Sequence, residues 1–238
     1  MITALIFAAG TGQRMNSRAK PKQFLNLHGK PIVLYTMEHF EEHPDVDNIV
    51  VVCLESWIKQ LKHLLKQYGF EKVTQIVPGG RTGHESIYNG LKALEGVCKP
   101  EDIVLIHDGV RPLINQQLIT SNIAVARQHG AAITVEACTE TVVSCPSPEK
   151  VDTVFNRQIM YTAKAPQTFT YGLIWDLHQR ARKDKHQCVD SAHLLSLYGT
   201  EMHTVIGPSN NIKITTPVDY YIFRSIYEAY ENRQIMGI

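Results

Sequence analysis

The first loop of the chain carries residue types that suit a phosphate group. It reads Ala8-Ala9-Gly10-Thr11-Gly12-Gln13-Arg14-Met15, and shortly after it comes Lys20-Pro21-Lys22-Gln23-Phe24. Glycines let backbone N–H groups approach an anion closely, because no Cβ stands in the way. Arg14 and Lys22 bring cationic side chains to the same place. We therefore expect this loop to bind phosphate.

The sequence of this loop does not match either of two well-known phosphate-binding motifs. A Walker loop needs a second glycine followed by Lys and Ser or Thr, and a dinucleotide fingerprint needs a small residue where Met15 stands. Two glycines alone would be equally compatible with a tight connection that binds nothing. The cations Arg14, Lys20 and Lys22 favour the phosphate site over that simpler interpretation.

Similar loops follow other predicted strands. The apolar run 2–7 precedes the first loop, a strand at 73–77 precedes Gly79-Gly80, and a strand at 103–107 precedes Asp108-Gly-Val-Arg111. The carboxyl ends of parallel strands share one sheet edge, where α/β proteins bind ligands. Asp108 could be a helix N-cap, or its carboxylate could serve Mg²⁺ or a substrate hydroxyl. These loops are expected to form one crevice.

The elements that would position these loops alternate along the chain. Strands are expected at 48–53 and 132–137, with helices at 32–40, 57–68, 84–94 and 117–129 between or beside them. Two further helices are expected at 171–181 and 191–198, with a strand at 203–206 and a closing helix from Pro217. This alternation predicts an α/β protein with a doubly wound, mostly parallel sheet, formed by one domain over residues 1–238.

Residues 139–161 break this rhythm. Short β-prone runs flank a turn at Pro146-Ser147-Pro148, which is typical of a hairpin, and the segment is too polar to form a core layer. A lone hairpin is marginally stable in water. We therefore expect a projecting arm that packs on a second copy of the chain in a homodimer.

Composition limits the classes of partner. The formal net charge of the 238 residues is +1, so no global field would recruit nucleic acid or an anionic membrane. The five cysteines are scattered without a Cys-x-x-Cys pair, and no apolar run is long enough to span a membrane. These features predict reduced thiols and a cytoplasmic location.

Six motifs, in order and from end to end of the chain, carry a resemblance. They are 7–15, 20–24, Gly79-Gly80 with Glu85-Ser86, 107–112, 165–169 and 211–215. Together they resemble the cytidylyltransferases that join CTP to a polyol phosphate and release pyrophosphate. That family includes a 2-C-methyl-D-erythritol 4-phosphate branch and a ribitol 5-phosphate branch. The ribitol 5-phosphate branch is slightly favoured as the source of the acceptor.

The resemblance implies roles for particular residues. Ala8, Ala9, Gly10, Thr11 and Gly12 would cradle the triphosphate and base, and Gly80 and Ser86 would contact the cytidine. The catalytic cations would be Arg14, Lys22 and Lys213. The alcohol phosphate and polyol would be held by Asp108, Arg111, Arg157, Asp190 and Lys213. Arg157 lies on the arm, which the family passes to a partner subunit, so it would act at the neighbouring site.

The implied chemistry needs no protein nucleophile. A phosphate oxygen of the acceptor attacks the α-phosphorus of CTP, and preorganised cations with Mg²⁺ offset the repulsion between the two anions. His107 could serve as a general base, but a phosphate monoester is already ionised at neutral pH. A structural role is therefore expected for His107.

Several positions depart from the family pattern. Gly83 stands where an arginine is common, whereas Arg81 directly follows Gly80. Ala165 and Val189 replace two threonines typical of the erythritol branch, and 190–193 reads Asp-Ser-Ala-His where the ribitol branch usually has Ser-Asp-Ala-Cys. Lost hydroxyls favour a polyol other than methylerythritol phosphate, because sites that hydrogen-bond substrate hydroxyls discriminate strongly.

Three other functions stay open at this stage. One is a methylerythritol phosphate cytidylyltransferase of isoprenoid biosynthesis. Another is a nucleotide-sugar transferase, whose metal motif could only be Asp45-Val-Asp47, which precedes a strand and would lie at the wrong sheet edge. The third is a regulator that binds CTP without turnover, and the joint presence of Arg14, Lys22 and Lys213 argues against it.

Overall fold

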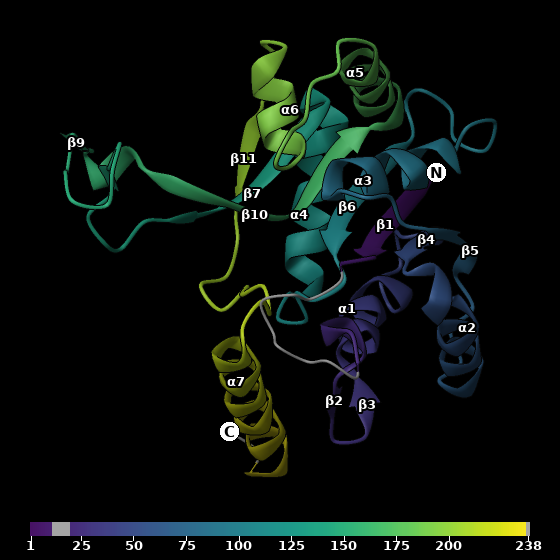
Figure 1. Ribbon diagram of the computed structural model, residues 1–238. Helices are drawn as coiled ribbons and strands as arrows, with labels where there is room; N and C mark the ends of the chain where they lie inside the picture. The colour runs from purple at the N-terminus through teal and green to yellow at the C-terminus, as the bar shows by residue number, and fades with distance from the viewer. Residues whose placement is uncertain (11–19, 237–238) are drawn as a thin grey trace.

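The central element is a seven-stranded mixed sheet. The computed structural model describes residues 1–10 and 20–236, and within them the strand order is β11-β7-β10-β6-β1-β4-β5 (Figure 1). The bounds are β1 Ile2–Ala8, β4 Asn48–Cys53, β5 Val73–Pro78, β6 Ile103–Asp108, β7 Ala131–Ala137, β10 Tyr161–Thr170 and β11 His203–Ile206. Strands β1, β4, β5 and β6 pair in parallel, so their carboxyl ends share one edge, as the sequence predicts.

Helices cover both faces of this sheet. One face packs against α1 (Ile32–Glu41), α2 (Ile58–Gln67) and α4 (Gln116–His129). The other packs against α3 (Gly83–Lys92), α5 (Tyr171–Lys183) and α6 (Ser191–Leu197). Strands β4 and β6 are buried along their whole length, which agrees with the apolar runs 49–53 and 103–106 inside them. The doubly wound α/β architecture is thus confirmed.

Strand β10 is the main departure from the expected topology. No strand is expected between the arm and the helix at 171–181, yet β10 runs antiparallel between β6 and β7. Its pairing shifts register between Ala163 and Gln167, around Pro166, which has no N–H to donate. Its interior residues Gln167 and Thr168 are polar but buried, and both hydrogen-bond to other side chains. Because it contains a proline and polar interior residues, this strand lacks the apolar pattern from which a strand is predicted.

The arm projects from the sheet as the sequence predicts. Strands β8 (Val143–Ser144) and β9 (Thr153–Val154) pair antiparallel, and the short helix η4 (Arg157–Ile159) follows. Figure 1 shows this hairpin standing well away from the helices and the sheet. Val154 and Ile159 are 64% and 73% exposed, so the arm carries apolar surface that the single chain leaves in solvent.

Short elements lie beside the crevice. The turn η2 (Lys22–Phe24) leads into a hairpin of β2 (Asn26–Leu27) and β3 (Lys30–Pro31), and η3 (Glu55–Trp57) precedes α2. Phe24 stacks on Trp57 with ring centroids 4.5 Å apart. The C-terminal helix α7 (Pro217–Met236) packs through Phe223 in a third cluster that includes residues of α1 and Ile214. Among the described residues, no helix is both long and apolar enough to cross a membrane.

Candidate active site

A cavity of about 640 Å³ opens at the carboxyl ends of the parallel strands. Its walls are formed by the ends of β1 and β6, the loop before α3, the turn η2 and the segment before α7. The described residues that line it are Phe7, Ala8, Ala9, Gly10, Lys22, Gln23, Leu54, Gly80, Arg81, Thr82, Gly83, Ser86, Asp108, Val110, Lys213 and Thr215. A cavity of this size can hold a nucleotide. The crevice expected from the loops is therefore present.

The glycine pair packs directly against the first loop. A Cβ added to Gly79 would collide with the Cβ of Ala9, and one added to Gly80 would collide with the side chain of Glu85. Gly79 N also donates to the carbonyl of Cys53, at the end of β4. Glycine is thus required at both positions by close approach, and at Gly79 this approach joins the loop after β5 to Ala9.

The start of α3 shapes the same wall. Thr82 caps the helix by accepting from Glu85 N at 3.1 Å. The Ser86 hydroxyl accepts from Gly80 N at 3.0 Å and donates to the Thr82 carbonyl at 2.9 Å. Ser86 therefore holds the glycine loop in this structure, and its contact with cytidine stays a prediction.

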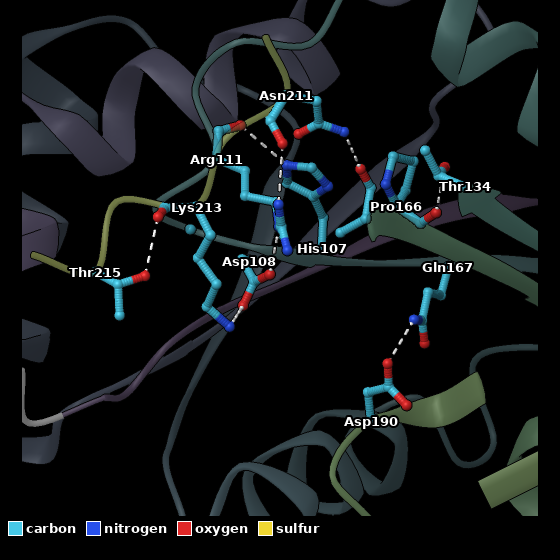
Figure 2. Close-up of polar contacts among 12 residues, drawn as sticks. His107, Asp108, Arg111, Thr134, Pro166, Gln167, Asp190, Asn211, Lys213 and Thr215 are labelled. Atoms are coloured by element: carbon cyan, nitrogen blue, oxygen red, sulfur yellow. Dashed lines mark hydrogen bonds and ion pairs between the residues drawn. The ribbon is translucent and has the colours of Figure 1, made fainter. Parts of the chain in front are cut away.

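A buried carboxylate organises the cationic side of the cavity. Asp108 Oδ1 lies 2.5 Å from Lys213 Nζ, and Asp108 Oδ2 accepts from Arg111 Nε at 2.7 Å (Figure 2). Burial raises the pKa of the Asp108 carboxyl, but the charges of Lys213 and Arg111 outweigh it and lower the pKa to about 2. Asp108 is thus ionised and holds two cations in fixed positions.

The segment that carries Lys213 is tied down over long sequence distances. Arg111 Nη1 donates to the Asn211 carbonyl at 3.1 Å, and Asn211 Nδ2 donates to the Ala165 carbonyl at 2.7 Å. Asn211 is fully buried, and Figure 2 shows it above Arg111 and beside Pro166. Residues 211–215 are neither helix nor strand, and these side-chain bonds hold them in place together with the bond from Ile214 N to the Val110 carbonyl at 2.9 Å.

Lys22 reaches the same segment from the other end of the chain. It is buried, and its Nζ donates to the Ile214 carbonyl at 2.9 Å. Lys213, the preceding residue, lies with its Nζ 5.7 Å from the centre of the Phe7 ring. The two lysines expected to act on one phosphate therefore line one cavity.

His107 is directed into the protein. It is fully buried, and its Nε2 lies 3.1 Å from the carbonyl of Arg111. Burial is the main reason why its pKa falls to about 3, which keeps the ring neutral at physiological pH. It does not line the cavity. This position agrees with the structural role expected for it.

The described residues offer little to a metal ion by themselves. They contain no group of three metal-ligating side chains, and Asp108 is the one carboxylate among those that line the cavity. Both Asp108 oxygens already meet cations. Mg²⁺ commonly takes one carboxylate and completes its shell with substrate phosphates and water. Asp108 fits that limited role and no larger one.

Some predicted site residues are not brought to the cavity. Arg157 is exposed on the arm, where its Nη1 donates to the Thr139 carbonyl at 3.0 Å. Asp190 caps α6 by accepting from His193 N at 2.9 Å, and it also accepts from Gln167 Nε2 at 3.0 Å (Figure 2). Neither lines the cavity of its own chain. The predicted residues Thr11, Gly12 and Arg14 lie outside the described part of the structure.

The cavity also contains residues to which the sequence assigned no role. Gln23, Thr82 and Thr215 line it, as does Arg81, which was noted only as a departure from the family. Gln23 stands inside the second motif, between Lys22 and Phe24, so its place beside a predicted catalytic lysine was the available signal.

The metal motif Asp45-Val-Asp47, which a nucleotide-sugar transferase would need, lies at the opposite edge of the sheet. Asp47 Oδ2 accepts a hydrogen bond from Ile2 N at the start of β1.

The cavity is lined by the cations Lys22, Arg81 and Lys213 and lies at the carboxyl edge of a doubly wound sheet, which is where α/β proteins bind nucleotides. Residues 2–228 match the family model for 2-C-methyl-D-erythritol 4-phosphate cytidylyltransferase, IspD, and the chain belongs to this family of cytidylyltransferases.

The chain is similar to curated relatives of both branches. The chain is 46% identical to the ribitol-5-phosphate cytidylyltransferase of Vibrio parahaemolyticus and 42% identical to that of Streptococcus agalactiae serotype Ia, in each case over 100% of both chains. It is 38% identical to the 2-C-methyl-D-erythritol 4-phosphate cytidylyltransferase of Clostridium botulinum strain Loch Maree, over 95% of this chain and 97% of that one. The resemblance drawn from the six motifs is thus confirmed.

Solved structures support the same family. The 4-diphosphocytidyl-2C-methyl-D-erythritol synthase of Anaerococcus prevotii superposes with a TM-score of 0.83 and 27% identity, covering 96% of each chain. The Francisella tularensis 2-C-methyl-D-erythritol 4-phosphate cytidylyltransferase superposes with a TM-score of 0.76 and 27% identity, covering 94% of this chain and 99% of that one. Membership of an enzyme family leaves no support for the non-catalytic regulator.

Proposed function

We propose that this cytidylyltransferase transfers CMP from CTP to ribitol 5-phosphate, giving CDP-ribitol and pyrophosphate. The observation that carries the choice of acceptor is the higher identity, along the full chain, to relatives named for ribitol 5-phosphate. The absence of threonine at Ala165 and Val189 supports the same choice, because the erythritol branch typically has a hydroxyl at each position.

The proposed reaction is an in-line displacement at phosphorus. A phosphate oxygen of ribitol 5-phosphate forms a bond to the α-phosphorus of CTP, while the bond from that phosphorus to the bridging oxygen of the β-phosphate breaks. The electron pair leaves with pyrophosphate. Both reactants are anions, so fixed cations are the main requirement.

Lys22 and Lys213 are suited to supply those cations. Each is held by a protein oxygen, at 2.9 Å for Lys22 and 2.5 Å for Lys213, so little reorganisation is needed when charge develops on the phosphoryl oxygens. Arg14 would add a third cation. Ala8, Ala9, Gly10, Thr11 and Gly12 would cradle the triphosphate, and Gly80 and Ser86 would contact the cytidine.

Asp108 and Arg111 would act on the acceptor side. A carboxylate has about four lone-pair positions, so Asp108 can accept from a ribitol hydroxyl or bind Mg²⁺ while it stays paired with its cations. Mg²⁺, when bound, would neutralise phosphate charge. The family typically uses a divalent metal, and in this chain most of its ligands would come from CTP.

The arm would complete the site in a homodimer. Arg157 and Asp190 do not line the cavity of their own chain, and the arm exposes Val154 and Ile159. Pairing two arms would bury that apolar surface and carry Arg157 to the neighbouring cavity. A dimer is therefore part of the proposed function.

Pyrophosphate release tests the proposed acceptor. The protein is incubated with CTP and Mg²⁺ and either ribitol 5-phosphate or 2-C-methyl-D-erythritol 4-phosphate. We expect a clearly higher kcat/KM with ribitol 5-phosphate. The family model and the solved structures favour methylerythritol phosphate as the second candidate. Faster turnover with that acceptor would refute the ribitol assignment while leaving the reaction type intact.

A further inference from the structure

Gln23 is a buried side chain at the cavity to which the proposed reaction gives no task. It is 1% exposed and lies in the η2 turn, between Lys22 and Phe24. Its Nε2 donates to the Ala8 carbonyl at 2.6 Å and to the Gly10 carbonyl at 3.1 Å. Both carbonyls belong to residues that line the cavity next to the expected triphosphate.

Those two carbonyl oxygens would otherwise oppose an anion. A carbonyl oxygen carries partial negative charge, and a phosphate-binding loop works by presenting N–H groups instead. The amide of Gln23 engages both oxygens from the protein side, so their negative ends are directed at a buried donor. The same bonds hold residues 8–10 in one conformation, which reduces the ordering cost of binding.

The η2 turn also controls the opposite wall. Its first residue, Lys22, bonds to Ile214 beside Lys213, and its last, Phe24, stacks on Trp57. One three-residue turn therefore contacts residues 8–10, the segment 211–215 that carries Lys213, and Trp57 before α2. A shift of Gln23 would disturb the cradle and Lys22 together.

We propose that Gln23 is a positioning residue that sets the affinity of the loop at residues 8–10 for the triphosphate of CTP, acting through the carbonyls of Ala8 and Gly10. The inference rests on the proposed function, because it requires CTP in this cavity. It predicts that the loss of the amide weakens binding of CTP and of pyrophosphate, while the affinity for the acceptor changes little.

The first test compares two glutamine variants of the full-length protein. Gln23→Met keeps the size of the side chain but removes the donor. Gln75→Met is the matched control, since Gln75 Nε2 donates to the Ala93 carbonyl at 3.1 Å, away from the cavity. Titration calorimetry should show the Kd for CTP rising about tenfold or more in Gln23→Met and staying unchanged in Gln75→Met. The KM for the acceptor should stay within about twofold of wild type in both.

The second test uses pH. In Gln23→Glu the ionised carboxylate would face two carbonyls without a donor, whereas the protonated acid can donate to one of them. Affinity for CTP relative to wild type should therefore recover as the pH falls from about 8 to about 6, in the direction set by a buried carboxyl whose pKa is raised. A residue needed only for folding would produce no such recovery.

Two results would overturn the inference. If Gln23→Met lowers Tm but binds CTP and pyrophosphate as wild type does, Gln23 is structural only, and the proposed function stands. If wild-type protein binds neither CTP nor pyrophosphate, the proposed function fails and the inference fails with it. Wild-type binding thus separates the two failures.

Discussion

Lys22 and Lys213 are the two lysines that we propose act on the reacting phosphate. They are 191 positions apart in the numbering, yet Lys22 bonds to the residue that follows Lys213. Changing either to Ala should lower kcat by about 10²-fold or more, the loss expected when one preorganised charge is removed from a transition state. Steady-state kinetics would measure this, with the Kd for CTP changing less than kcat.

Lys20→Ala is the control for this experiment. Lys20 Nζ donates to Asn26 Oδ1 at 3.1 Å, and Lys20 does not line the cavity. Activity near the wild-type level is expected. A crippled Lys20→Ala together with a normal Lys22→Ala would show that the loop acts two residues earlier than assigned. Normal activity of Lys213→Ala as well would refute the site.

The Asp108 carboxylate links the site to stability in acid. Because its folded pKa is about 2 and the ordinary value is 3.8, the ion pairs contribute stability above pH about 4 that is lost as pH falls toward 2. The contribution is about 2 kcal/mol. Wild type should be more stable than Asp108→Asn at neutral pH, and denaturant titrations should show that gap narrowing in acid.

An exposed carboxylate provides the comparison. Asp152 lies on the arm and is exposed, so Asp152→Asn should follow the wild-type acid dependence within about 0.5 kcal/mol. A gap between wild type and Asp108→Asn that stays constant from pH about 7 to about 2 would contradict the ion-pair explanation.

At the scale of elements, the close approach of Gly79 to Ala9 joins two loops whose residues Ala9 and Gly80 line the cavity. Gly79→Ala should push these two walls apart, because its new Cβ would collide with that of Ala9. The KM for CTP is expected to rise about tenfold or more, since small displacements of binding groups are costly. Kinetics with CTP as the varied substrate would measure it.

Gly90→Ala gives the matched clash in α3 away from the cavity. Its Cβ would collide with Leu5 and Val52 in the core. Its Tm should fall while the KM for CTP stays normal. If both variants behave alike, the effect of Gly79→Ala reflects packing alone and not the shape of the site.

At the scale of the whole molecule, the arm is expected to make the dimer and complete the site. Deleting residues 144–151 removes the tip of the hairpin and should lower the oligomeric state and the activity together, because Arg157 would no longer reach the partner. Sedimentation velocity and pyrophosphate release would measure the two effects. A deletion variant that remained dimeric with normal turnover would show that the arm has neither role.

The sequence by itself determined the parallel part of the sheet and the edge that carries the site. Apolar runs, helix periodicity and glycine turns are local properties, so they mark β1, β4, β5 and β6 and the loops after them without knowledge of the fold. The six ordered motifs identified the family for the same reason, because each motif is read over a few adjacent residues.

Only the tertiary structure decided which groups meet. Lys213 pairs with Asp108, and Arg111 bonds to the Asn211 carbonyl, each across about a hundred positions, and Gln23 bonds to the backbone carbonyls of Ala8 and Gly10. Strand β10 enters the sheet although Pro166 and buried polar residues conceal its pattern. Such contacts depend on how distant segments pack, and no local pattern of residue types specifies them. The sequence named the residues that can do chemistry, and packing decided what each one touches.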